Sequence, residues 1–133
     1  GLFSARSHRR ALAHPDRKVL AVMGDGSFLM NSQEMETAVR ENIPLKILVW
    51  VDDSYGLIKW KMDMASGSHA CVDFATPDFV TYAASFGAKG YQVASAAELR
   101  PTLRRALDEP GVSRWPAPWT TARTWPLSTR WAN

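Results

Sequence analysis

The sequence is poor in the features that mark secreted and membrane-spanning proteins. It contains a single cysteine, Cys71, in 133 residues, which excludes an internal disulfide and favours a reducing, cytoplasmic setting. No apolar run approaches the roughly 20 residues that a membrane-spanning helix needs. The basic residues 1–10 are not followed by the apolar segment of a signal peptide, and the sequence has no initiator methionine. We therefore expect a cytoplasmic domain without membrane contact, in a sequence that begins within a longer protein.

Several common ligand-binding patterns are also missing. The sequence has neither the spacing of a calcium-binding EF-hand loop nor the lysine of a phosphate-binding P-loop. Its histidines, His8, His14 and His69, are not spaced as metal ligands. The net charge is +3, and residues 6–10 and 114–130 carry much of the positive charge. No basic helical face or stacking motif accompanies these segments, so we expect no nucleic-acid partner.

The remaining composition, 46% apolar and 22% charged, is that of a globular domain. Continuous apolar runs predict strands at residues 18–23, 45–51 and 90–93. Helical periodicity predicts helices from residue 31 to a stop signal at 42–44, over 77–86, and over 95–107. We expect Asn31 and Glu34 to cap the first helix reciprocally, and Ser95 to cap the last. Apolar strands separated by helices predict an α/β fold with a parallel sheet and helices on both faces.

Carboxylates directly follow two of the predicted strands. Asp25 lies in a Gly-Asp-Gly turn after the first strand, and Asp52 opens an Asp-Asp-Ser turn after the second. One helix and one strand separate the turns, so both should lie at the carboxyl edge of the sheet, where ligands bind in this fold class. The helix from Asn31 should point its free N–H groups at the same crevice. Either turn alone is commonly a plain loop, but the pair predicts a cation such as Mg²⁺ shared with a phosphate group.

The two turns resemble the thiamine diphosphate motif, in which Gly-Asp-Gly is followed later in the chain by Asn-Asn or an equivalent pair. The resemblance extends over residues 14–113, which look like the C-terminal cofactor domain of acetolactate synthase catalytic subunits. The runs WVDDSY and DFATPDF look most like the FAD-independent, catabolic branch. The resemblance implies Mg²⁺ ligation by Asp25, Asp52 and the backbone carbonyl of Ser54. Val51 departs from the usual asparagine, whereas Asp52 keeps a hard oxygen ligand.

The resemblance also implies which residues would bind the cofactor. Ser27 and Tyr55 lie where donors could meet the diphosphate, with capping and core packing as the ordinary alternatives. Trp60 resembles a substrate-pocket position, although a tryptophan on a helix is more often packing. Apolar positions near the thiazolium ring, or else plain core, correspond to Met30, Leu57 and Ile58. The complete implied cofactor-binding set is Gly24, Asp25, Gly26, Ser27, Asp52, Ser54, Tyr55, Gly56, Leu57 and Ile58.

The implied activity belongs to a larger enzyme. Acetolactate synthases condense two pyruvates to 2-acetolactate with release of CO₂, a transferase reaction in which thiamine diphosphate stabilises the carbanion. In this family the glutamate that activates the cofactor lies on a separate pyrimidine domain, contributed by a partner subunit. We therefore assign no catalytic residue to this chain, expect it to be inactive alone, and expect the full-length enzyme to be a homo-oligomer. The alternatives are a pyruvate oxidase or 2-oxoacid decarboxylase carrying the same domain, and a non-catalytic folded remnant.

The two ends of the chain differ from the central domain. Residues 1–13 are expected to be a disturbed segment, and residues 114–133 form a tail rich in Trp, Pro, Thr and Arg without helical or strand period. Prolines at 116, 118 and 126 should interrupt any helix or central strand. The tail is typical of an out-of-frame product, which would make the fold truncated; the alternative is a stacking arm for single-stranded nucleic acid. We expect deletion of 114–133 to leave stability nearly unchanged.

Overall fold

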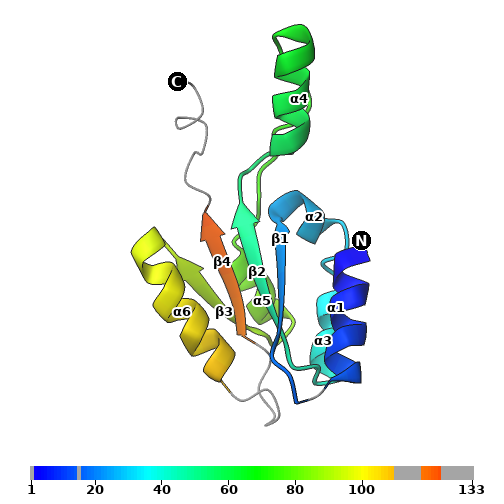
Figure 1. The fold of residues 1–133 in the computed structure, drawn as a ribbon, viewed down its shortest axis with the longest axis vertical. Helices are drawn as coiled ribbons and strands as arrows, with labels where there is room; N and C mark the ends of the chain where they lie inside the picture. The colour runs from blue at the N-terminus through cyan, green and yellow to red at the C-terminus, as the bar shows by residue number, and fades with distance from the viewer. Residues whose placement is uncertain (1, 15, 110–117, 124–133) are drawn as a thin grey trace.

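The computed structural model describes residues 2–14, 16–109 and 118–123, with only the backbone described for 2–5, 8 and 118–123 (Figure 1). The helices are α1 (Leu2–Ala13), α2 (Asp25–Leu29), α3 (Glu34–Arg40), α4 (Gly56–Ser66), α5 (Phe79–Ser85) and α6 (Ala96–Asp108). The strands are β1 (Val19–Gly24), β2 (Leu45–Val51), β3 (Lys89–Val93) and β4 (Pro118–Arg123). In this part of the chain, no helix is long and apolar enough to span a membrane.

The strands form one four-stranded sheet in the order β1-β2-β4-β3, and every neighbouring pair is parallel. The register pairs Gly24 at the end of β1 with Trp50 near the end of β2. Helices α1, α3 and α5 lie on one side of the sheet and α6 on the other, whereas α4 projects beyond the ends of β1 and β2 (Figure 1). The predicted α/β fold, with a parallel sheet covered on both faces, is confirmed.

The two faces of the sheet are covered to different extents. One face carries the main core, in which Met23 and Ile47 of the sheet pack with Met35 of α3 and Phe79 of α5. The opposite face has a small cluster of Leu48 and Val93, packed with Trp50 and with Leu99 of α6. On this second face the β1 side chains Leu20 and Val22 are 36% and 43% exposed. The sheet is therefore deeply buried on one side and partly open on the other.

The predicted strands agree with the structure to within one residue. Strands predicted at 18–23, 45–51 and 90–93 are observed as β1, β2 and β3. The helix predicted at 77–86 is observed as α5, and Asp78 caps it by accepting the Val80 N–H at 2.9 Å. The last predicted helix is observed as α6 with Ser95 at the N-cap position. The Ser95 side chain makes no capping bond to the backbone; its hydroxyl donates to Glu98, which itself accepts the Ala94 N–H.

The segment after β1 differs from the prediction. Helix α2 begins at Asp25, immediately after the strand, and α3 begins at Glu34 rather than Asn31. Gln33 occupies the N-cap position of α3, and no side chain makes a capping bond there. The predicted caps by Asn31 and Glu34 are therefore wrong. The physical reason is that residues 30–33 connect two short helices through backbone bonds, including Asn31 N–H to Phe28 C=O at 3.1 Å.

Two more elements lie outside the helices and strands that periodicity predicted. Helix α4 has no buried residue, so it shows none of the core-facing periodicity on which the prediction depended. Residues 2–13 form α1, in which Ala11 is fully buried against the main core.

The prediction that the tail lacks a central strand is wrong for residues 118–123. These residues form β4, which pairs with both β2 and β3. The strand begins at Pro118, a position where the missing N–H of proline is tolerated. The predictions for 114–117 and 124–133 lie outside the described residues.

Candidate functional site

The ends of β1 and β2 are joined through the carboxylate of Asp25. This side chain is only 2% exposed. Its Oδ1 accepts the Gly26 N–H at 2.7 Å, and its Oδ2 accepts the N–H groups of both Asp52 and Asp53 at 2.8 Å. A buried carboxylate is costly unless hydrogen bonds compensate it, and backbone donors do so here. The expected proximity of the two Asp turns is thus achieved by direct bonds between them.

The hydrogen bonds described for Asp25 leave one acceptor position of its carboxylate for a ligand. A carboxylate has about four acceptor positions, and the described bonds use two on Oδ2 and one on Oδ1. Asp52 lies beside it on the exposed side of the turn. A Cβ built on Gly56 would collide with Oδ2 of Asp52, so glycine at this position leaves room for the carboxylate at the start of α4.

The Gly26 position is shielded by two aromatic rings. A Cβ at Gly26 would lie 2.7 Å from Tyr55 Cε1 and 3.3 Å from Phe74 Cζ. The two rings lie with centroids 4.8 Å apart at an angle of 50°. Only glycine allows this approach of the turn to the rings. By contrast, nothing lies within 4 Å of a Cβ built on Gly24, so crowding by the described residues does not require glycine there.

A cleft of about 460 Å³ lies at this edge of the sheet. Every residue predicted to bind the cofactor lines it: Gly24, Asp25, Gly26, Ser27, Asp52, Ser54, Tyr55, Gly56, Leu57 and Ile58. Met30 and Trp50 complete the lining, and Trp50 was not singled out from the sequence. Trp60 does not line the cleft. No residue of α3 does either, so the expectation that this helix points at the crevice is wrong; the helices that begin at the cleft are α2 and α4.

The cleft lining combines two carboxylates with exposed apolar side chains. Met30, Leu57 and Ile58 are 63%, 66% and 52% exposed, so the interpretation of these residues as core is excluded. None of the lining residues is Lys or Arg. Within the described ranges there is no group of three or more His, Cys, Asp and Glu side chains placed to hold a metal ion. A cation here would depend on two carboxylates, backbone carbonyl oxygen and the ligand's own oxygens, a set that suits Mg²⁺.

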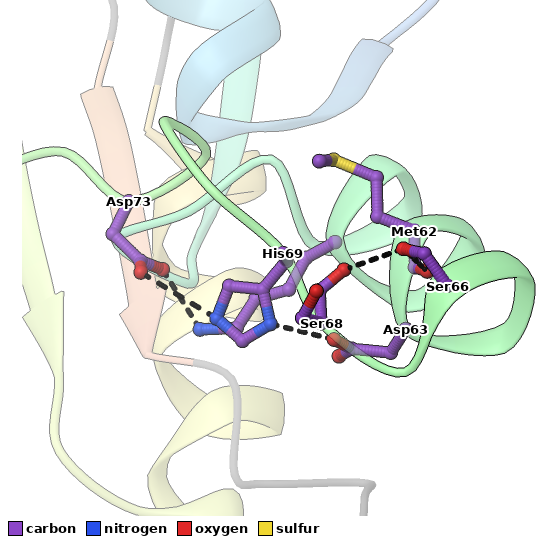
Figure 2. Close-up of polar contacts among 7 residues, drawn as sticks. Met62, Asp63, Ser66, Ser68, His69 and Asp73 are labelled. Carbon is purple, nitrogen blue, oxygen red and sulfur yellow. Dashed lines mark hydrogen bonds and ion pairs between the residues drawn. The ribbon is translucent and has the colours of Figure 1, made fainter.

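A second polar cluster fixes the loop that returns from α4 (Figure 2). His69 Nδ1 lies 2.7 Å from Asp63 Oδ1, and His69 Nε2 lies 3.9 Å from Asp73 Oδ2. Lys59 donates to Asp73 at 2.8 Å, and this hydrogen bond is the main cause that lowers the pKa of Asp73. Spacing alone gave His69 no role, because its partners are brought together only when the loop folds back.

The same returning loop is also bonded to the Asp turn. An isolated antiparallel bridge joins Ser54 and Asp73. Around it, the Tyr55 N–H donates to Val72 C=O at 2.8 Å, and the Phe74 N–H donates to Asp53 C=O at 3.0 Å. Residues 72–74 therefore support the Asp turn through backbone bonds to Asp53 and Tyr55.

Comparison with known proteins shows which family this domain resembles. Residues 7–114 match the family described as thiamine pyrophosphate enzyme, C-terminal TPP binding domain. The chain is 43% identical over 100 residues to the catabolic acetolactate synthase of Raoultella terrigena, covering 75% of this chain and 18% of that protein. It is 39% identical over 101 residues to an acetolactate synthase of Bacillus subtilis (strain 168), covering 76% and 18%. These matches confirm the resemblance predicted from the sequence.

Other enzymes share the domain. The 3D-(3,5/4)-trihydroxycyclohexane-1,2-dione hydrolase of Bacillus subtilis (strain 168) is 38% identical over 103 residues, or 71% of this chain and 16% of that protein. Among solved structures, the thiamine diphosphate-dependent 4-hydroxybenzoylformate decarboxylase of Rhodococcus jostii RHA1 superposes with a TM-score of 0.76 and 28% identity, over 89% of this chain and 22% of the other. The chain thus spans less than a quarter of the length of each of these relatives. It belongs to the thiamine pyrophosphate enzyme family, of which it carries the C-terminal TPP-binding domain.

Proposed function

We propose that this domain binds Mg²⁺ and thiamine diphosphate in the cleft between the β1 and β2 strand ends. The metal ligands are Asp25, Asp52 and the backbone carbonyl of Ser54. The observation that carries this proposal is that all the residues predicted to bind the cofactor line one cleft, with the buried Asp25 among them. A diphosphate in this cleft would face two carboxylates without a basic side chain, and a divalent cation resolves that repulsion.

Different residues of the cleft would contact different parts of the cofactor. Gly26 lets the turn approach the Tyr55 and Phe74 rings, and Gly56 leaves room for the Asp52 carboxylate. Ser27 and Tyr55 line the cleft and are available as polar contacts to the diphosphate. Met30, Leu57 and Ile58 provide an apolar wall for the ring system of the cofactor. Thiamine diphosphate, when bound, supplies the carbanion stabilisation of the reaction.

The parent activity that we propose is that of an acetolactate synthase, with pyruvate as substrate and 2-acetolactate and CO₂ as products. The acetolactate synthases among the relatives support this choice. The activating glutamate would come from the pyrimidine domain of a partner subunit in a homo-oligomer. Exposed apolar side chains on α4, the helix that begins at the cleft, include Trp60 at 57% and Met64 at 70% and suit a surface that another domain covers.

Isothermal titration calorimetry with thiamine diphosphate tests the binding proposal. We expect thiamine diphosphate to bind the wild-type chain only when Mg²⁺ is present, and Asp25→Asn or Asp52→Asn to abolish that binding. Asp53→Ala should weaken it less than Asp52→Ala does. Asp108→Asn is the matched control, because Asp108 is an exposed aspartate paired with Lys18 and remote from the cleft. Equal effects of all these changes would refute the ligand assignment.

Product analysis tests the reaction. The isolated chain should form no acetolactate from pyruvate, since it would lack the activating glutamate. A full-length enzyme carrying this domain should form acetolactate. Formation of acetyl phosphate or of free aldehyde as the main product would instead support a pyruvate oxidase or a 2-oxoacid decarboxylase, and absence of cofactor binding would support a non-catalytic remnant.

A further inference from the structure

The turn that follows β2 depends on an unusual backbone conformation. Asp53 has a φ of +52°, in the left-handed region that non-glycine residues adopt at some cost. In this conformation its N–H and that of Asp52 point to the same place, and both donate to Asp25 Oδ2 at 2.8 Å. Successive N–H groups around a left-handed residue form a concavity that binds anionic oxygen. The orientation of the Asp25 carboxylate therefore depends on Asp53 remaining left-handed.

Thr76 holds Asp53 from the other side. Its hydroxyl donates to Asp53 Oδ1, and the Phe74 N–H donates to the carbonyl of the same residue at 3.0 Å. Thr76 is half-buried and lines a separate, smaller cleft of about 260 Å³, rather than the cofactor cleft. The polar connection from the Thr76 hydroxyl to the cofactor site runs through Asp53 and Asp25.

We propose that Thr76 is a positioning residue for the cation-binding carboxylate Asp25. This inference rests on the proposed binding of Mg²⁺ and thiamine diphosphate. The Thr76 hydroxyl fixes the Asp53 side chain, the fixed side chain keeps the backbone left-handed, and the resulting pair of N–H groups holds Oδ2 of Asp25. With Oδ2 held, the remaining acceptor position on Oδ1 keeps one orientation toward the cleft.

The test compares substitutions that keep or remove the hydroxyl. Thr76→Val preserves the shape without the donor, and Thr76→Ser preserves the donor. Thr81→Val is a matched control, because the Thr81 hydroxyl makes the same kind of bond, at 2.7 Å, to Asp78 Oδ2 at the start of α5. In a titration with thiamine diphosphate and Mg²⁺, Thr76→Val should bind about tenfold more weakly, as for loss of one bond to a charged group. Thr76→Ser and Thr81→Val should bind like wild type.

A glycine at position 53 provides a sharper test, since glycine adopts positive φ without support. In an Asp53→Gly background, adding Thr76→Val should leave the cofactor affinity unchanged, which a general loss of stability would not produce. If Thr76→Val alone does not fold, the Thr76→Ala change made in the Asp53→Gly background carries the same comparison. A further tenfold loss in this background would overturn the proposal.

Amide hydrogen exchange without cofactor separates this inference from the proposed function. The Asp52 and Asp53 N–H groups should exchange faster in Thr76→Val, but not in Thr76→Ser or Thr81→Val. If wild type binds the cofactor and Thr76→Val binds equally well, the positioning role is refuted while the proposed function stands. If wild type does not bind it, the proposed function fails, and the exchange rates decide: faster exchange supports positioning of Asp25 by Thr76, and unchanged exchange refutes it.

Discussion

Replacement of Asp25 should destabilise the domain as well as empty its cation site. The carboxylate is 2% exposed and accepts the N–H groups of Gly26, Asp52 and Asp53 at 2.7–2.8 Å. Each bond to a charged acceptor contributes about 1.5–3 kcal/mol, but bonds that share one carboxylate are not additive, and burial of the charge offsets part of the gain. Asp25→Ala removes the acceptor of all three bonds, so we expect the free energy of unfolding to fall by about 3–5 kcal/mol.

Asp25→Asn should be less damaging to stability. An amide has a single carbonyl oxygen, which can replace Oδ2 and accept from Asp52 and Asp53, while its NH₂ group then faces the Gly26 N–H. We expect a loss of about 1–3 kcal/mol, because the main pair of bonds is kept and one is lost.

Urea unfolding followed by circular dichroism measures both changes. Asp78→Ala is the control, since Asp78 is an exposed helix cap whose loss should cost about 1 kcal/mol. The reasoning would be refuted if Asp25→Ala were no worse than Asp78→Ala, or if Asn and Ala at position 25 were equally destabilising.

Two further predictions concern the sheet. Deletion of residues 118–133 should lower the free energy of unfolding by more than about 3 kcal/mol, because it removes β4 and exposes the pairing edges of β2 and β3; unchanged urea denaturation would restore the expectation of a dispensable tail. Lys46 is 5% exposed, and burial lowers its pKa from the ordinary value of 10.5. At neutral pH the buried charge therefore lowers the free energy of unfolding. This loss shrinks as the pH rises toward 10.5 and Lys46 loses its proton in the folded state. Lys46→Met should raise stability at pH 7, with an advantage that shrinks toward pH 10.5, and a destabilised variant at pH 7 would contradict this.

The sequence predicted those elements whose residues are mostly apolar because they are buried. Strand β2 is apolar at every position except Lys46 because both of its faces are covered, and its prediction at 45–51 matches the structure. The cleft residues were found because a short motif places carboxylates and glycines at the ends of adjacent strands. By contrast, α4 was missed because its apolar residues face outward.

Features that depend on contacts between distant parts of the chain have no such pattern in the sequence. The residues of β4 have no strand periodicity, and the strand is specified by backbone pairing with β2 and β3. The bond from Thr76 to Asp53 connects residues that only the folded loop brings together. Likewise, the Asn31 cap was predicted from local preference, but the helix that starts at Asp25 left Asn31 in a connecting turn.

The central position of β4 also constrains the order in which the chain acquires its structure. Strands β1 and β2 pair directly and can associate early during synthesis, because a single crossover joins them. Strand β3 pairs only with β4 among the described strands, and β4 is the last of them to be made. Until residues 118–123 leave the ribosome, β3 has no neighbour and β2 keeps an open, apolar edge. During that interval the nascent chain should be most dependent on chaperones, since unpaired strand edges promote aggregation.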